Sequence, residues 1–266
     1  MEKHNFKKKF GQNFLHDENV LLNIVANLNV TRNDLIVEVG PGAGALTKHL
    51  IKLGCPILAY EIDTTLENQL KSIECDDLQV IFKDFMETNL EEDLKKYNYH
   101  NLYLVANLPY YITTPILERV IESKVEFKEV IVMVQDEVAK RLTSSAGSRD
   151  FGAFTVLLDY YYDRKYLFYV DRNAFYPVPS VDSAVMKLTL KENIDEINYN
   201  NFKKFIFDSF QFKRKNLRNN FKKYDLDTIE NILKKYDFSL NNRAEEINTK
   251  IFVELFNCLK QESKKS

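Results

Sequence analysis

The sequence predicts an α/β protein with a doubly wound, mostly parallel β-sheet, followed by a small all-helical C-terminal domain. Short apolar runs alternate with helical segments through the first 190 residues, and helical spacing of large apolar residues replaces this alternation afterwards. The chain has 266 residues, of which 45% are hydrophobic, so it is long enough to bury one large core and one small core.

The first element predicted is a helix that begins after Asp17, a residue type that caps helix N-termini. Apolar runs rich in β-branched residues then predict five strands, at residues 35–39, 57–62, 78–82, 102–106 and 130–134. Helices are expected between them: one ending at Leu50, one from about Thr64, one after Pro115 and one ending at Leu142. Two more strands are expected near residues 166–170 and 184–190.

After residue 190 the large apolar residues fall at helical spacing. They form three groups: Phe202, Phe205, Ile206 and Phe210; Ile229, Ile232 and Leu233; and Ile251, Phe252, Leu255 and Phe256. The charge changes at the same place, because residues 191–266 contain 16 Lys and Arg against 12 Asp and Glu although the whole chain has a net charge of −2. We therefore predict two domains, residues 1–190 and residues 191–266.

Composition excludes several classes of protein. No stretch approaches the roughly 18 apolar residues of a membrane span, and the charged first ten residues lack the apolar core of a secretory signal. The three cysteines, Cys55, Cys75 and Cys258, form no C-x-x-C pair, and the four histidines lack metal-ligand spacing. The sequence thus predicts a cytoplasmic protein without membrane contact, disulfides or a metal site.

Basic residues cluster in two places. Lys7, Lys8 and Lys9 stand near the start of the chain. The second cluster consists of Lys203, Lys204, Lys213, Arg214, Lys215, Arg218, Lys222 and Lys223, with Asp208 the one acidic residue among them. Charge runs are usually solvated faces, but such a local excess is also what binding to a phosphate backbone requires.

Three consecutive strands are followed by residues suited to a nucleoside. Gly40-Pro41-Gly42-Ala43-Gly44 follows the first strand, where glycines let the backbone approach a ligand closely. Glu61 ends the second strand, where an acid binds ribose hydroxyls, and Asp84 follows the third, in position for an adenine amino group. With Ala45, the loop also fits a dinucleotide-binding dehydrogenase, and a tight strand-to-helix turn explains it equally well on its own.

The segment Asn107-Leu108-Pro109-Tyr110 follows the fourth strand. Adenine N6 is a poor nucleophile because its lone pair is delocalised into the ring. The Asn107 side-chain carbonyl and the Leu108 backbone carbonyl are suited to accept the amino hydrogens, which localises that lone pair. Pro109 fixes the turn, and Tyr110 offers a face for a base. An isolated tetrapeptide of this kind is more often an ordinary turn; its place after the fourth strand favours the functional interpretation.

Five ordered motifs carry a resemblance to a known family. They are Gln12-Asn13-Phe14-Leu15, Glu38-Val39-Gly40-Pro41-Gly42, Asn107-Leu108-Pro109-Tyr110, residues 175–185 (Phe175 to Val185), and Phe210 with Lys213-Arg214-Lys215 and Leu217-Arg218-Asn219-Asn220. Together they resemble the small-subunit ribosomal RNA adenine N6-dimethyltransferases. The resemblance runs from about Lys7 to the last helices, and it implies a Rossmann-like methyltransferase domain followed by a helical rRNA-binding domain.

The resemblance also implies roles for individual residues. S-adenosylmethionine would be bound by Asn13, Leu15, Gly40, Glu61, Asp84 and Asn107. Catalysis would involve Asn107, Leu108, Tyr110 and Phe175, with Phe175 stacking on the target adenine opposite Tyr110; as a pattern alone, Phe175 fits a core aromatic equally well. Ribosomal RNA would be contacted by Lys213, Arg214, Lys215 and Arg218.

The family dimethylates two adjacent adenosines in the 3′-terminal hairpin loop of small-subunit rRNA, in a partly assembled subunit. We expect the same substrate here, no metal, and a monomer. Three alternatives stay open: a large-subunit rRNA adenine methyltransferase conferring macrolide resistance, an NAD-dependent dehydrogenase, and an rRNA-binding assembly factor without activity. The motif residues Pro41 and Leu108 favour the small-subunit enzymes over the first alternative.

Overall fold

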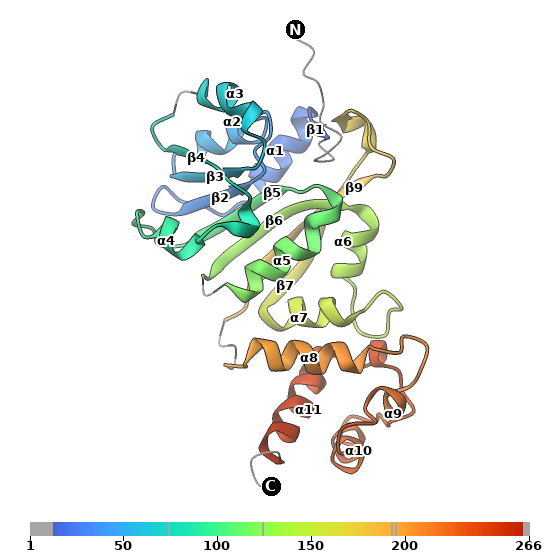
Figure 1. Cartoon of the computed structure of the whole chain (residues 1–266). Coiled ribbons are helices and arrows are strands. Elements are labelled where there is room, and N and C mark those ends of the chain that lie inside the picture. Colours follow the sequence, from blue (N-terminus) through green and yellow to red (C-terminus); the bar gives the residue numbers. More distant parts are fainter. Residues whose placement is uncertain (1–12, 74, 124, 193, 195, 263–266) are drawn as a thin grey trace. The chain divides into compact units, whose positions relative to one another are not determined.

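The computed structural model describes residues 13–73, 75–123, 125–192, 194 and 196–262 (Figure 1). The chain divides into two compact units. The first contains the residues up to Ala139 together with Lys165–Leu190, and the second contains Lys140–Arg164 and the residues from Lys191 onward.

The first unit is built on a seven-stranded sheet with the strand order β4-β3-β2-β5-β6-β9-β7. Its strands are β2 (Leu35–Val39), β3 (Ile57–Glu61), β4 (Leu78–Phe82), β5 (Leu102–Asn107), β6 (Phe127–Gln135), β7 (Tyr162–Val170) and β9 (Ser183–Leu190). Strands β2 to β6 pair in parallel, and β9 pairs antiparallel with β6. The prediction of a doubly wound, mostly parallel sheet is confirmed.

Helices cover this sheet, as its apolar strands require. They are α1 (Glu18–Ala26), α2 (Thr47–Leu50), α3 (Glu67–Lys71), α4 (Leu90–Leu94), α5 (Thr113–Glu122) and α6 (Asp136–Leu142). Figure 1 shows helices over both faces, with α5 crossing in front of β6 in this view. Every residue of β2 is buried, which explains why the strand lacks polar alternation. The predicted cap is also confirmed, because the Asp17 carboxylate accepts hydrogen bonds from the backbone of Asn19 and Val20.

Two features of this unit differ from expectation. Helix α5 begins at Thr113, ahead of Pro115. Proline is tolerated in the first turn of a helix because the backbone N–H groups there have no acceptor within the helix, so the N–H that proline lacks costs no hydrogen bond. A small antiparallel sheet, unforeseen from the sequence, pairs β1 (Phe14–Leu15) with β8 (Phe175–Tyr176). It places Leu15 opposite Phe175.

The second unit is a helical bundle with its own core. Its helices are α7 (Ala153–Tyr161), α8 (Tyr199–Ser209), α9 (Leu217–Asn220), α10 (Leu226–Lys234) and α11 (Thr249–Glu262). The sequence predicts no helix at α7 and assigns its residues to the domain 1–190, but Val156 and Leu157 of α7 are fully buried in the same cluster as Phe202. The rings of Tyr160 and Phe202 lie 5.1 Å apart. This packing is why Lys140–Arg164 groups with the C-terminal helices, so residue 190 marks only one of the boundaries.

Candidate active site

A pocket in the first unit opens where the order of the strands reverses. Strands β3 and β4 follow β2 in one direction, whereas β5 and β6 continue in the other. The loops that leave the carboxyl ends of β2 and β5 therefore diverge, and doubly wound sheets bind ligands at this switch point. The pocket contains about 1180 Å³ of space, part of which is open solvent at its mouth.

The structure brings the predicted ligand-binding and catalytic residues together at this pocket. Its lining includes Asn13, Leu15, Gly40, Glu61, Asp84, Asn107, Leu108, Tyr110 and Phe175. Two opposed parts of the lining differ in chemistry. We call Glu38, the Gly40–Gly44 loop, Glu61 and Asp84 the carboxylate wall, and Asn107–Tyr110 with Phe175 the amide wall.

The loop of the carboxylate wall requires glycine at two positions. Gly42 has a φ of +57°, and a Cβ there would lie 3.2 Å from the Phe14 ring. Gly44 has a φ of +79°, and a Cβ there would lie 2.5 Å from the Ile73 side chain. Because φ is positive at both positions, any other residue would be strained there.

Glu61 joins this loop to the end of β3. One carboxylate oxygen accepts a hydrogen bond from the Gly42 backbone N–H at 2.9 Å, and the other accepts one from Asp63 at the same distance. Burial raises the pKa of the Glu61 carboxyl, which is 2% exposed. Each oxygen keeps a second lone pair that can accept a ligand hydroxyl.

Asp84 begins the short 3-10 helix Phe85–Glu87, and its Oδ1 accepts a hydrogen bond from the Met86 backbone at 2.9 Å. Phe85 lines the pocket, and the guanidinium of Arg119 lies 5.4 Å from the centre of its ring. Arg119 also donates to the carbonyl oxygens of Met86 at 2.9 Å and Thr88 at 2.5 Å. A residue of α5 thus fixes the segment that follows Asp84.

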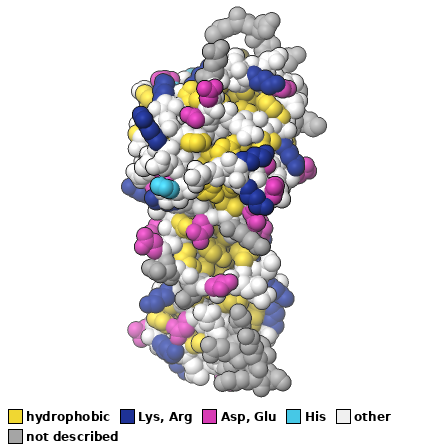
Figure 2. Space-filling view, turned by 90° about the vertical axis from the view of Figure 1, so that its left-hand side faces the viewer, with side chains coloured by type: hydrophobic (Ala, Val, Ile, Leu, Met, Phe, Trp, Pro, Cys, Tyr) yellow, Lys and Arg dark blue, Asp and Glu magenta, His cyan; other side chains and the backbone are white. Residues whose placement is uncertain are grey.

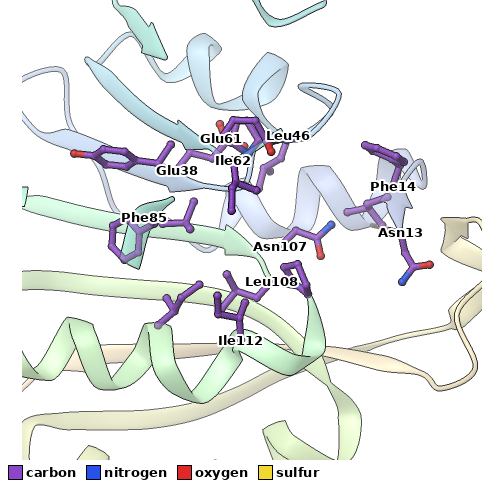
Figure 3. A pocket seen from close by; sticks show the side chains of 18 of the residues that line it. Asn13, Phe14, Glu38, Leu46, Glu61, Ile62, Phe85, Asn107, Leu108 and Ile112 are labelled. Carbon is purple, nitrogen blue, oxygen red and sulfur yellow. Dashed lines mark hydrogen bonds between the residues drawn. The ribbon is translucent and has the colours of Figure 1, made fainter. Parts of the chain in front are cut away.

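Asn107 is the last residue of β5, in register with Met133 of β6. The Leu108 N–H donates to the Met133 carbonyl at 3.3 Å, which holds the start of the turn, and Pro109 has a φ of −55°. Figure 3 shows the Asn107 amide extending toward the side of the pocket where Asn13 and Phe14 lie. This amide forms no hydrogen bond with any residue that the structure describes, so its carbonyl oxygen is available to a ligand.

Two aromatic rings complete the amide wall. The Tyr110 hydroxyl lies 3.0 Å from the Ser183 hydroxyl in a hydrogen bond, and burial raises the pKa of Tyr110. Phe175 is 3% exposed and packs in the same core cluster as Leu15, yet it also lines the pocket. The two interpretations of Phe175, core residue and pocket residue, are therefore compatible.

Sequence analysis missed Glu38 as a site residue, although it stands in one of the quoted motifs. It is 1% exposed, lines the pocket and accepts a hydrogen bond from the Thr47 hydroxyl at 2.8 Å. Burial raises the pKa of the Glu38 carboxyl to about 8. The sequence does carry a signal, since Glu38 is the one charged residue in the otherwise apolar strand Leu35–Val39.

The predicted RNA-contacting cations lie in the second unit and do not line the pocket. Lys213, Arg214, Lys215 and Arg218 are all exposed, and none forms an ion pair with a residue that the structure describes. By contrast, Lys223 is paired with Asp208 at 2.7 Å. Figure 2 shows Lys and Arg side chains among acidic ones on the face it draws. The cluster Lys7–Lys9 lies outside the described residues.

Two features are absent from residues 13–262, apart from the few positions that the structure does not describe. No group of three or more His, Cys, Asp or Glu there could hold a metal ion. No described helix is long and apolar enough to cross a membrane.

Comparison with known proteins identifies the family. The model of the ribosomal RNA adenine dimethylase family matches residues 3–261. The chain belongs to this family. It is 37% identical to the ribosomal RNA small subunit methyltransferase A of Lactococcus lactis, over 96% of this chain and 90% of that protein. It is 38% identical to the protein of the same name from Mycoplasma mobile, over 95% of this chain and 98% of that protein.

Two solved structures share the fold. A dimethyladenosine transferase from Plasmodium falciparum superposes with a TM-score of 0.81 at 22% identity, covering 94% of this chain and 98% of the other. The 23S rRNA methyltransferase ErmE superposes with a TM-score of 0.72 at 23% identity, covering 93% and 100%. The family assignment identifies the chain as a methyltransferase and removes the dehydrogenase alternative.

Proposed function

We propose that this protein transfers methyl groups from S-adenosylmethionine to N6 of two adjacent adenosines in the 3′-terminal hairpin loop of small-subunit rRNA, giving N6,N6-dimethyladenosines during ribosome assembly. The observation that carries the proposal is the Asn107 amide, which ends β5 without a hydrogen-bond partner among the described residues and lines the same pocket as Glu61 and Asp84. The two small-subunit methyltransferases at 37% and 38% identity support the choice of substrate.

The carboxylate wall fits the methyl donor. Glu61 keeps lone pairs for the ribose hydroxyls. Oδ1 of Asp84 accepts the hydrogen bond from the Met86 N–H, which leaves Oδ2 to accept from the adenine amino group. Ile62, which is 45% exposed and lines the pocket, and Phe85 supply apolar surface for a purine ring. S-adenosylmethionine, when bound, supplies an electrophilic methyl group on a sulfonium.

The amide wall prepares the adenine. The Asn107 side-chain carbonyl and the Leu108 backbone carbonyl accept the two amino hydrogens, which draws N6 toward tetrahedral geometry and localises its lone pair. The turn at Pro109 keeps the two acceptors in place. No strong base is needed, because the nitrogen becomes acidic once it is methylated.

Aromatic residues hold the base in position. The Ser183 hydroxyl fixes the Tyr110 ring at its far end, and the backbone pairing of β8 with β1 fixes Phe175. The proposed role of both rings is to stack on the target adenine, which requires a base that has left its own stack. A hairpin loop meets this requirement at low cost, since its bases are already unpaired.

The second unit supplies charge for the RNA backbone. We assign the phosphate contacts to Lys213, Arg214, Lys215 and Arg218, because these cations are exposed and unpaired among the described residues. The proposal includes a cytoplasmic monomer that acts on a partly assembled small subunit. Comparable methylation of an isolated hairpin would contradict that last point.

The large-subunit alternative is separated from the proposal by a direct assay. Small subunits and large subunits from cells that lack the gene are incubated with the purified protein and labelled S-adenosylmethionine, and the rRNA is digested for mass spectrometry. We expect dimethyladenosine in small-subunit rRNA alone, and none with Asn107→Ala at the same enzyme concentration. Label in large-subunit rRNA alone would establish the alternative.

A further inference from the structure

The loop between α8 and α9 presents an aromatic residue at the surface of the second unit. Phe212 is 49% exposed, although phenylalanine is among the residues most often buried. Its neighbour Phe210 packs on the core, with its ring 5.6 Å from that of Phe252, whereas Phe212 is not part of that cluster. Phe212 is therefore half exposed and lies outside the core cluster on which Phe210 packs.

The backbone at Phe212 is anchored on both sides. Its N–H donates to the side-chain oxygen of Asn220 at 2.9 Å, and Asn220 is a buried residue of α9. Its carbonyl accepts a hydrogen bond from the Lys215 N–H at 2.8 Å, which closes a turn. The ring is thus displayed from a fixed backbone, so little conformational entropy is lost when it binds a partner.

Three exposed cations, Lys213, Arg214 and Lys215, directly follow this ring. Cations alone can bind any phosphate backbone, including that of a duplex. In a duplex the faces of the bases are stacked on one another, so an aromatic ring cannot reach them. An exposed ring beside cations suits an unpaired nucleotide, which offers a base face and a phosphate together. The carboxylates of an acidic protein would use the charges but offer no aromatic face to the ring.

We propose that Phe212 stacks on an unpaired base of the rRNA while the cations that follow it bind the neighbouring phosphates. This inference rests on the proposed function for the identity of the partner. It adds a base-contacting residue outside the pocket and predicts that the second unit distinguishes unpaired RNA from duplex RNA.

The chain contains no tryptophan, so Phe212→Trp creates a single tryptophan whose emission can be excited apart from that of the tyrosines. We expect an unpaired RNA oligonucleotide to quench its emission, and a duplex of the same length to quench it far less. The matched control is Leu22→Trp on α1, since Leu22 is also 49% exposed and has no run of cations beside it. Its emission should not respond to either RNA.

A second variant separates stacking from charge. Phe212→Ala should weaken binding of unpaired RNA about tenfold without changing the slope of log affinity against log salt concentration. Lys215→Ala should instead reduce that slope by about 0.7, the value for one phosphate contact on a single strand.

Each outcome decides the inference. Wild-type affinity for Phe212→Ala, equal quenching of Phe212→Trp by duplex, or equal quenching by an acidic peptide would overturn it and leave the proposed function intact. Failure of the wild-type protein to bind the unpaired RNA would also overturn stacking by Phe212, whereas the proposed function is tested separately, by methylation of small subunits.

Discussion

The two walls of the pocket hold their polar groups in opposite ways. On the carboxylate wall each acceptor already has an internal partner: Glu61 bonds two backbone amides, Asp84 one, and Glu38 a buried hydroxyl. On the amide wall the Asn107 side chain has no partner among the described residues. An acceptor with internal bonds is fixed in place before its ligand arrives, while an acceptor without them keeps its full capacity for the substrate.

This difference suits the two tasks that we assign to the walls. Binding the methyl donor requires a rigid surface. If an acceptor had to be ordered first, the entropy lost would reduce the affinity gained from its hydrogen bond. Activating an amino group requires acceptors whose strongest interaction is made in the transition state. The predictions below test whether the walls can be separated by mutation.

The largest effect is expected on the amide wall. Asn107→Ala removes one of the two acceptors for the amino hydrogens, so the transition state should lose at least about 3 kcal/mol of stabilisation. The measurement is the single-turnover rate of methylation with both substrates saturating. Because the Asn107 side chain forms no hydrogen bond with the described residues, the variant should melt like the wild type. Turnover close to wild type would remove the amino-group mechanism.

The next largest effect separates the two roles of Phe175. Phe175→Leu keeps most of the buried volume but removes the aromatic face, so methylation should lose roughly 1–3 kcal/mol of base stacking. The rate at limiting RNA concentration measures this loss, and the free energy of unfolding shows whether the core survives. Phe175→Tyr is the control that retains a ring. An unchanged rate for Phe175→Leu would make Phe175 a core residue alone.

The sequence was sufficient to place most of this pocket because of one geometric rule. Gly40, Glu61, Asp84 and Asn107 each stand at or just beyond the end of an apolar run, and parallel strands end at a common edge of the sheet. Residues as far apart in the sequence as Gly40 and Asn107 could therefore be brought together without knowledge of their contacts.

What the sequence did not reveal depends on long-range packing. Strands β1 and β8 have two residues each, too few to show a period, yet their pairing brings Leu15 beside Phe175. Helix α7 lies between strands in the sequence, so a boundary at residue 190 assigns it to the first domain, although its buried face packs in the helical core. The role of Arg119 depends on carbonyl groups more than 30 residues away, which no local pattern encodes.

The third prediction concerns the pH dependence of the carboxylate wall. The pKa of Glu38 is about 8 in the folded protein against 4.5 ordinarily, because burial disfavours its charged form. The folded protein therefore binds this proton more tightly than the unfolded chain, so the contribution of Glu38 to stability is greatest at low pH and falls as the pH rises toward 8. Glu38→Gln should gain about 1.4 kcal/mol relative to wild type for each pH unit within that window.

Urea unfolding of both proteins at several values between about pH 5 and pH 8 provides the measurement. Glu38→Gln keeps the shape of the side chain and an oxygen that can accept from Thr47, so the comparison isolates the ionisable group. Two stability curves that run parallel across the window would show that Glu38 is not held in its neutral form.

The smallest effect tests whether the walls are independent, because Arg119 connects them. Helix α5, which carries Arg119, starts directly after the turn of the amide wall, while the guanidinium holds Met86 and Thr88 behind Asp84. Arg119→Met keeps the apolar stem but loses those hydrogen bonds, so the KM for S-adenosylmethionine should rise about fivefold, or about 1 kcal/mol. The KM for RNA should stay constant.

A loss of adenine recognition would show that Arg119 positions Asp84 and does not merely stabilise the segment that follows it. If Arg119 holds Asp84 in place, the variant should discriminate less between S-adenosylhomocysteine and its inosine analogue, in which a carbonyl replaces the amino group. Arg32→Met, the same change at an exposed residue of the first unit, should leave both affinities unchanged. If Arg119→Met lowered the affinities for both ligands equally, the segment after Asp84 would be merely destabilised. A higher KM for RNA would mean that the two walls are coupled.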